Sequence, residues 1–355
     1  MDVPRIWPRI VAVGIGAAPA AAAPAVADGT APDDCAYTVP DSGGTYDKAV
    51  RSGQTICGGP GDDTVLKMNG GRFLGYGGND RVDEKEAGRF IGGAGADSVG
   101  THLDGVFLGG QGPDHVEILR NGLYDGGKGN DTAGRQHSGY FIGGDGHDSL
   151  AILLNGTFSG GAHDDSITEE HRKGVFAAGP GNDSSAKQTG GTTRGGSGID
   201  RVEQMSGNAV FNGGPDRDIV VELLGSARFS GNKGNDLVED RLGDKASFFG
   251  GPGHDGVFRM TDSARFAGGE DRDTVEWMYD FAVFNGGPKA DAVARQLGGV
   301  FAGNKGPDSV GDDELFYGLS AGLANGGPGD DTINACTGGS GTHTRFEIET
   351  TTTCP

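Results

Sequence analysis

Apolar and polar positions recur along the chain with a period of 17 to 19 residues, and only the last interval is longer, at 23. Each period opens with a hexad of the form GGxGxD. An aliphatic residue follows two positions after its Asp, and an aromatic residue stands two positions before the next hexad. The sixteen hexads begin at Gly58, Gly75, Gly92, Gly109, Gly126, Gly143, Gly160, Ala178, Gly195, Gly213, Gly231, Gly250, Gly268, Gly286, Gly303 and Gly326. Two short apolar segments between two turns predict two short β-strands per repeat.

Such a repeat cannot bury its apolar residues alone, so the repeats are expected to stack. Stacking in register gives parallel strands about 4.8 Å apart, with hydrogen bonds running between coils. We therefore predict an all-β fold, a parallel β-roll or β-solenoid of about 16 coils. Aliphatic residues would form one internal ladder and stacked Phe the opposite one. The predicted organisation is an N-terminal cap over residues 28–57, the repeats over 58–334, and a C-terminal cap over 335–355.

Composition and charge narrow the choice of partners. The chain has 71 Gly among 355 residues but no three-residue Gly period, which excludes collagen. Its net charge of −21 would repel phosphates, so no nucleic-acid partner is expected. A chain this acidic and rich in Gly is either disordered or folded with the help of cations.

The sixth position of the hexad is Asp in all sixteen copies: Asp63, Asp80, Asp97, Asp114, Asp131, Asp148, Asp165, Asp183, Asp200, Asp218, Asp236, Asp255, Asp273, Asp291, Asp308 and Asp331. In stacked coils, neighbouring carboxylates would repel each other by ~0.9 kcal/mol even in water. Calcium accepts six to eight oxygen ligands in loose geometry, so Ca²⁺ held by these carboxylates and glycine carbonyls would remove the repulsion. The alternative is that the Asp side chains only cap backbone N–H groups in the turns.

The hexad with its apolar residue, as in GGPGDDTV and GGKGNDTA, resembles the glycine-rich nonapeptide of RTX (haemolysin-type) calcium-binding proteins. The resemblance covers Gly58 to about Asn334. It implies a parallel β-roll with Ca²⁺ between same-side turns of successive coils and the Asp column as principal ligand. In that family the nonapeptides usually run in tandem, whereas here only every other turn carries the hexad, so we expect one row of ions. Arg217, Arg272 and Lys289 within hexads predict weak or empty sites.

Four cysteines form two local pairs, for which three connectivities exist. Stacked coils would hold a Cys before the first repeat too far from a Cys after the last for the ~5.5 Å Cα separation of a disulfide. The expected bridges are therefore Cys35–Cys57 and Cys336–Cys354, each fastening a cap over an open edge strand.

Residues 1–27 have the plan of a secretory signal peptide, which predicts a secreted, extracellular product. Arg5 and Arg9 precede a weakly apolar stretch that ends in small residues, with cleavage expected after Ala27. No other apolar run approaches the ~20 residues that span a bilayer, so we do not expect a membrane-embedded protein. Disulfides suit an oxidising destination.

Catalytic residues are not expected. The segment Gly318–Gly322 matches the GxSxG nucleophile elbow, but that motif needs a strand-turn-helix in an α/β sheet. The eight His residues share no column of the repeat and are predicted to be surface residues. In the repeat from Ala178 to Arg194, Ser185 and Thr193 replace the aliphatic and the aromatic residue, which predicts a hydrated or mobile coil.

The sequence thus predicts a secreted, non-enzymatic calcium-binding repeat protein with a structural or adhesive role. Calcium bound between stacked turns would drive its folding. The alternative is a metal-independent β-solenoid scaffold that binds a glycan or a protein through its surface. The cluster of Trp277, Tyr279 and Phe281 is one candidate surface, although such residues more often cover the side of a coil. The cell-surface, glycan or protein partner itself is not specified by these residues.

Overall fold

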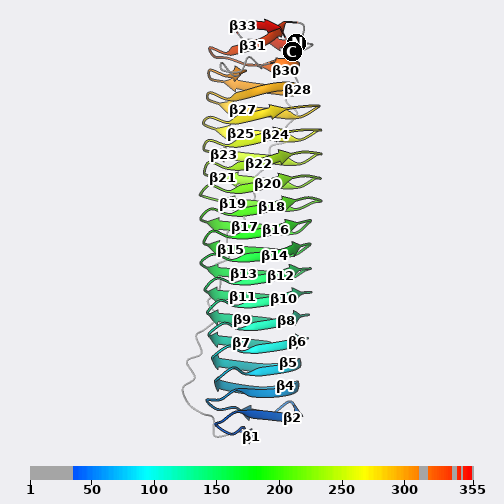
Figure 1. The fold of residues 1–355 in the computed structure, drawn as a ribbon, viewed down its shortest axis with the longest axis vertical. Coiled ribbons are helices and arrows are strands. Elements are labelled where there is room, and N and C mark those ends of the chain that lie inside the picture. The colour runs from blue at the N-terminus through cyan, green and yellow to red at the C-terminus, as the bar shows by residue number, and fades with distance from the viewer. Residues whose placement is uncertain (1–34, 312–318, 338–341, 345–346, 354–355) are drawn as a thin grey trace. The chain divides into compact units, whose positions relative to one another are not determined.

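The structure is a computed structural model that describes residues 35–311, 319–337, 342–344 and 347–353. Within these ranges the unit from Cys35 onward is all-β, and its coils stack one upon another (Figure 1). This confirms the predicted parallel β-solenoid. The same ranges contain no helix that is long and apolar enough to cross a membrane.

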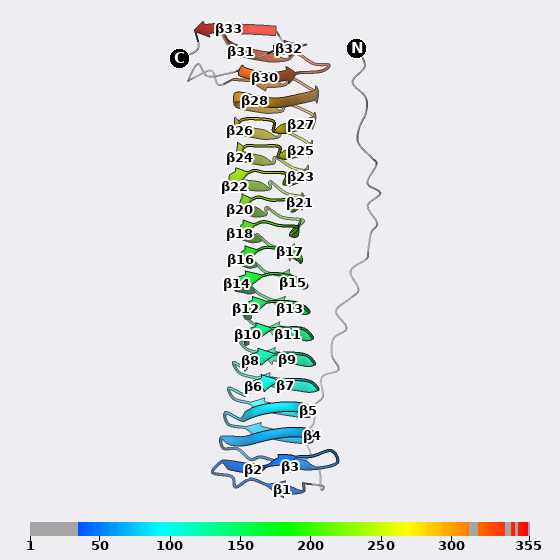
Figure 2. The ribbon, with the colours of Figure 1, turned by 90° about the vertical axis from the view of Figure 1, so that its right-hand side faces the viewer.

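Each coil contributes one strand to each of two parallel ladders, which lie on opposite sides of the stack (Figure 2). The first face begins after the hexad Asp and contains β2 (Gly44–Val50), β4 (Asp63–Gly77), β5 (Arg81–Ala94), β6 (Ser98–His102), β8 (His115–Leu119), β10 (Thr132–Gln136), β12 (Ser149–Leu153), β14 (Ser166–His171), β16 (Ser184–Gln188), β18 (Arg201–Met205), β20 (Ile219–Leu223), β22 (Leu237–Leu242), β24 (Gly256–Met260), β26 (Thr274–Met278), β28 (Ala292–Lys305), β29 (Ser309–Val310), β31 (Thr332–Thr337) and β33 (Glu347–Thr353). The long strands β4, β5 and β28 continue around the turn onto the second face.

The second face carries the aromatic residues and leads into the next hexad. Its other strands are β1 (Tyr37–Thr38), β3 (Thr55–Cys57), β7 (Val106–Gln111), β9 (Leu123–Lys128), β11 (Tyr140–Asp145), β13 (Thr157–Ala162), β15 (Val175–Pro180), β17 (Thr192–Ser197), β19 (Val210–Gly214), β21 (Arg228–Asn232), β23 (Ser247–Pro252), β25 (Arg265–Glu270), β27 (Val283–Pro288), β30 (Leu319–Asn325) and β32 (Thr342–Thr344). We call the hexad turn, which joins the second face to the first, the first turn; the other is the second turn.

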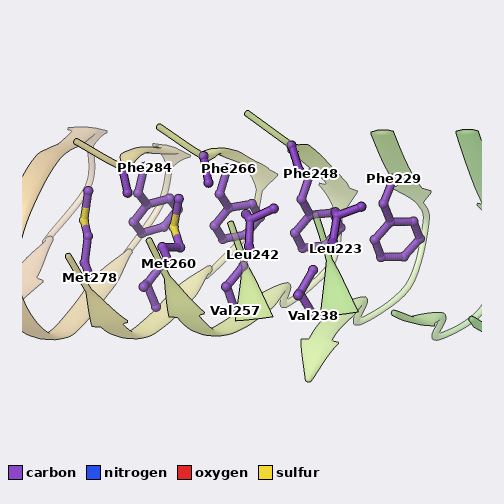
Figure 3. Close-up of a cluster of buried hydrophobic side chains, with 14 of the residues drawn as sticks. Leu223, Phe229, Val238, Leu242, Phe248, Val257, Met260, Phe266, Met278 and Phe284 are labelled. Atoms are coloured by element: carbon purple, nitrogen blue, oxygen red, sulfur yellow. The ribbon is translucent and has the colours of Figure 1, made fainter. Parts of the chain in front are cut away.

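The core consists of side-chain columns that run along the stack, as predicted. The aliphatic residues of the first face pair in register, for example Val82 with Val99, and are buried. Opposite them the Phe rings stack nearly parallel with centroids 4.6 to 5.1 Å apart. Figure 3 shows part of this arrangement, with Phe248 and Phe266 facing Val238 and Val257. Aromatic stacking of this kind adds to the free energy of apolar burial.

The central repeat interrupts the core. Thr193 stands in register between Phe176 and Phe211, and Ser185 takes an aliphatic position; both side chains are buried. The apolar core consequently divides into two clusters, one ending at Ala178 and the other beginning at Val202. The predicted polar coil is therefore present as a break in both internal ladders.

The predicted Cys35–Cys57 disulfide is present, with a Cα separation of 5.8 Å. It lies beside the parallel pair β1 and β3, so it fastens the first edge strand to the stack. The Cys336–Cys354 pairing, the signal peptide over 1–27 and the start of the GxSxG segment fall outside the residues that the structure describes.

Candidate functional site

All sixteen hexad Asp side chains are buried inside the first turn, each with an exposed fraction of 2% or less. The sequence predicted that they form one column but not that the column is internal. The strand that follows each Asp carries its aliphatic side chain inward two residues later, so period-two alternation turns the Asp inward as well. The candidate site is this continuous buried column of carboxylates.

The first oxygen of each carboxylate is bound by the backbone of the preceding coil. The N–H of Asp80 donates to Oδ1 of Asp97 at 2.7 Å, and the N–H of Asp131 donates to Oδ1 of Asp148 at 2.7 Å. Fifteen such bonds, 2.7 to 3.0 Å long, join the sixteen residues from Asp63 to Asp331. The expectation that these side chains cap backbone N–H groups is thus correct for one of their two oxygens.

The second oxygen is the unexplained atom. In every one of the sixteen residues, one buried carboxylate oxygen has no hydrogen-bond partner among the described residues, and in all but Asp63 it is Oδ2. A buried polar atom without a partner costs free energy, and a buried charge costs far more. A proton or a cation would satisfy these oxygens.

The glycine at hexad position one lies directly against this oxygen. A Cβ atom added to Gly143 would collide with Oδ2 of Asp148 and would stand 2.5 Å from the carbonyl oxygen of Gly160 in the next coil. The same two kinds of oxygen meet at Gly75, Gly109, Gly195 and Gly250. Position one is therefore Gly because two oxygens converge on the space that a side chain would fill.

Glycine at hexad positions two and four has a different cause, which is backbone conformation. Position two has positive φ in most coils, even where it is Asn232 or Asn304, at 79° and 81°. Position four has positive φ in most coils too, including those where it is His163 or Asp271. Both columns therefore favour Gly and Asn, which tolerate left-handed backbone best.

Burial changes the acidity of the column. Desolvation raises the pKa of Asp80, Asp114, Asp165, Asp200 and Asp273 to about 8, with neighbouring carboxylates adding to the effect and the backbone hydrogen bond opposing it. The pKa of Asp97, Asp148, Asp183, Asp236 and Asp291 rises to about 6 and that of Asp131, Asp218, Asp255 and Asp308 to about 7, again chiefly through desolvation. Without a cation, many of these carboxyls would therefore still hold a proton, and be neutral, near pH 7.

The side chains of the column can hold a hard cation only if backbone oxygens also act as ligands. No cluster of three or more Asp, Glu, His or Cys side chains suited to a metal ion occurs in the described part of the chain. Each coil instead offers one unpartnered carboxylate oxygen, and at Gly75, Gly109, Gly143, Gly195 and Gly250 a carbonyl oxygen of the next coil lies beside it. Calcium accepts backbone carbonyls beside carboxylates, so these oxygens match its chemistry.

One repeat lacks this arrangement. Ala178 stands at hexad position one, so its methyl group occupies the place where the two oxygens converge elsewhere. The same repeat contains Ser185 and Thr193 in the core. Asp183 is still buried and still accepts its backbone hydrogen bond from Asp165. This coil is the poorest candidate for a bound ion.

A second internal column was missed by the sequence reasoning. It lies five or six residues after each Asp, at the end of the first-face strand, and contains Met68, Lys85, His102, Leu119, Gln136, Leu153, His171, Gln188, Met205, Leu223, Leu242, Met260, Met278 and Gln296. His102 and His171 are buried in it, so the prediction that all His residues are on the surface is wrong for these two. The varied chemistry of its side chains hid the column, although a distance of five residues from the Asp in all but two of these repeats could have revealed it.

The polar members of this column cap the second turn. Gln136 Nε2 donates to the carbonyls of Gly139 and Thr157, and Lys85 Nζ donates to the carbonyl of Asp104 at 2.7 Å. Desolvation lowers the pKa of Lys85 to about 7 and that of His102 to about 3. Their role is to satisfy turn carbonyls inside the core.

The predicted aromatic cluster is divided between the outer first face, where Trp277 is half exposed, and the second turn. Trp277 lies in register between Arg259 and Arg295, and the Arg295 guanidinium stacks over its ring at 4.2 Å. Phe281, in the second turn, is 80% exposed. Trp277 therefore covers the side of the coil, as the simpler of the two expectations held.

No family model and no curated protein matches this chain. The resemblance of its hexads to RTX repeats thus stays a prediction from the sequence. The function is inferred from the carboxylate column itself, because that column is the feature that recurs in every coil.

Proposed function

We propose that this chain is a calcium-binding β-solenoid in which Ca²⁺, held by the buried Asp column, stabilises the stacked coils. The observation that carries the proposal is the second carboxylate oxygen, which is buried, lacks a hydrogen-bond partner among the described residues and faces a backbone carbonyl across a glycine. Asp148 with the carbonyl of Gly160, and the equivalent pairs in the other coils, would hold the ions. Calcium would supply the charge that lets the carboxylates ionise while buried.

A second reading shares the same geometry. The hydrogen bonds from backbone N–H to Oδ1 are complete without a metal. A proton on Oδ2 of Asp148 would face the carbonyl of Gly160 and could be donated to it. In that case the column is neutral, and the solenoid is the metal-independent scaffold.

The variant Asp148→Asn separates the two. Asn retains an oxygen for the N–H of Asp131, and its amide can donate to the carbonyl of Gly160, so it imitates a protonated Asp. If calcium binds, isothermal titration calorimetry at pH 7.5 will show fewer Ca²⁺ ions per chain than for the unsubstituted protein. Asp145→Asn is the matched control, because Asp145 is exposed in the same hexad.

The two readings predict opposite results. If calcium binds, Ca²⁺ will give a heat of binding that Mg²⁺ does not give. The number of bound Ca²⁺ ions will fall in Asp148→Asn but not in Asp145→Asn. If no Ca²⁺ is taken up, and Asp148→Asn is as stable as the parent or more so, the metal-independent scaffold is correct.

The proposed setting is outside the cell, where calcium is abundant and weak sites suffice. The disulfide between Cys35 and Cys57 supports an oxidising compartment. Within that setting we propose a structural or adhesive role and no catalysis.

A further inference from the structure

The first-turn edge of the C-terminal coils carries a row of basic side chains, although the chain as a whole has a net charge of −21. Six successive coils contribute one residue each, at hexad positions three to five: Arg217, Lys233, His254, Arg272, Lys289 and Lys305. All six residues are exposed. We call this row the basic ridge.

The ridge is confined to one half of the stack. In the nine coils from Gly58 to Asp200, the same three hexad positions contain a single Lys or Arg, Lys128, and two His, His147 and His163, against the acidic Asp62, Asp145 and Asp164. In the six coils of the ridge they contain five Lys or Arg against Asp216, Glu270 and Asp271. The local charge therefore changes sign along the first turn.

The ridge side chains are not neutralised by ion pairs. Among the described residues, the Arg and Lys of the ridge form no salt bridge to a carboxylate, whereas Arg201 and Arg241 on the neighbouring face pair with Glu203 and Asp262. Five unpaired cations at close spacing repel one another, and an anionic ligand would relieve that repulsion.

Two adjoining hollows follow the ridge. One, of about 520 Å³, is lined by Arg217, His254 and Arg272 together with Leu237; the other, of about 660 Å³, is lined by His254, Arg272, Lys289 and Lys305 together with Pro288 and Pro307. Because both include His254 and Arg272, they form one continuous depression along the stack. Its walls combine cationic groups and small apolar surfaces with one exposed acidic residue, Asp271.

We propose that the basic ridge binds a linear acidic polysaccharide that carries one carboxylate per sugar. Successive coils lie about 4.8 Å apart, which is comparable with the length of one sugar ring in a chain, and each coil of the ridge supplies one basic residue. Guanidinium and ammonium groups bind carboxylates, while the Pro and Leu surfaces can contact sugar ring faces. The repeat of the solenoid thus matches the repeat of the polymer.

This inference goes beyond calcium binding and is tested with calcium held constant. The probe is a fluorescently labelled polygalacturonate oligomer, and binding to the full chain is followed by fluorescence anisotropy. The ridge variant combines Arg217→Ser, Arg272→Ser, Lys289→Ser and Lys305→Ser. The control variant removes the same charge elsewhere, through Arg51→Ser, Arg120→Ser, Arg135→Ser and Arg194→Ser, all at exposed positions.

The ridge variant is expected to bind roughly tenfold more weakly or worse, and the control variant to bind like the parent. Both should keep the parent's circular dichroism, so a ridge failure is distinguishable from a failure of calcium binding. The unsubstituted protein gives a further test, because its affinity should fall steeply with added NaCl and neutral dextran should not compete. Equal losses in both variants, no binding by the parent, or tighter binding of polyphosphate or single-stranded DNA would overturn the proposal.

Discussion

The backbone N–H of Asp131 donates to Oδ1 of Asp148 at 2.7 Å, across the boundary between two coils. The N–H of Asp148 in turn donates to Oδ1 of Asp165 at 2.8 Å. Each Asp thus joins its own coil to both neighbours, as donor through its backbone and as acceptor through its side chain. A change that moves one carboxylate therefore disturbs the stacking of the coils as well as any ion held there.

Gly143→Ala should move such a carboxylate. The new Cβ would collide with Oδ2 of Asp148 and crowd the carbonyl of Gly160, so we expect a loss of on the order of 1–3 kcal/mol in the free energy of unfolding. Thermal unfolding in saturating Ca²⁺ measures it. Natural Ala178 occupies this position only in a coil whose core residues are small.

Gly256→Ala is the control for that substitution. Gly256 lies in β24 without positive φ, and the nearest atom to an added Cβ is Leu237 Cδ1 at 3.2 Å, the end of a flexible side chain. The free energy of unfolding of the Gly256→Ala variant should differ from that of the parent by only about 0.5 kcal/mol. Equal effects at Gly143 and Gly256 would show that position one has no special relation to the carboxylate.

The metal-free protein should become less stable as pH rises from about 4 to about 8. Burial raises the pKa of most column carboxyls to about 6 to 8, above the usual 3.8, so the folded state holds protons that the unfolded state has released. The stabilisation is complete below the unfolded pKa and is lost as pH passes the folded values. Melting temperatures of metal-stripped protein across this range test the prediction.

Calcium should reverse the trend, because its binding releases the column protons. The rise in melting temperature on adding Ca²⁺ is expected to be largest at pH 8 and to shrink towards pH 5. A metal-stripped protein that melts higher at pH 8 than at pH 5 would contradict the raised pKa values of the column carboxyls.

Thr193→Phe combined with Ser185→Val should stabilise the centre of the stack. Thr193 lies in register between Phe176 and Phe211, so a Phe there would join the two separate aromatic ladders. Apolar burial and ring stacking together suggest a gain of about 1–3 kcal/mol. The hydrogen-bond contact of Thr193 with buried His171 would be lost, and a net destabilisation would mean that this contact matters more than continuity of the core.

Local opening is expected at the same coil in the unsubstituted protein. The two apolar clusters end on either side of it, so β16 and β17 have the weakest apolar support among the central strands. Hydrogen exchange of their amides should be faster than in β12 and β13 or in β20 and β21. Uniform protection along the stack would refute this weakness.

Cys35→Ser should loosen the N-terminal edge. The bridge closes a loop of 22 residues, for which loop entropy gives about 3 kcal/mol when unfolding is a single cooperative event. Because the core is divided, the loss of stability should appear chiefly as faster amide hydrogen exchange in β1 to β4. An unchanged exchange rate there would show that strand pairing alone holds this edge.

The sequence predicted the repeat architecture because its columns keep one residue type. Asp148, Leu150 and Phe158 recur at fixed distances in their repeats, and a solenoid is the fold in which fixed distance becomes spatial alignment. The need for positive φ at Asn232 and Asn304 was predictable for the same reason.

The direction of the Asp side chains was not predictable from composition, since acidic residues are mostly exposed. Strand alternation from the buried Leu150 back to Asp148 would have indicated it. The column of Lys85, His102 and Gln136 escaped notice because its positions tolerate any side chain that either fills the core or caps the second-turn carbonyls. In the longer repeats the positive φ moves to Asp244, Asp262 or Asp280, a shift that only backbone geometry reveals.

The most direct test of calcium-dependent stacking is far-UV circular dichroism of the chain at pH 7.5, above the melting temperature of the metal-stripped protein, titrated with Ca²⁺ and then with EDTA, with Mg²⁺ as control. Calcium binding by the column predicts a cooperative gain of β-signal that is specific to Ca²⁺ and is reversed by EDTA. A full β-signal that survives EDTA, with no metal found by elemental analysis, would contradict it and leave the buried Asp column as a set of neutral turn caps.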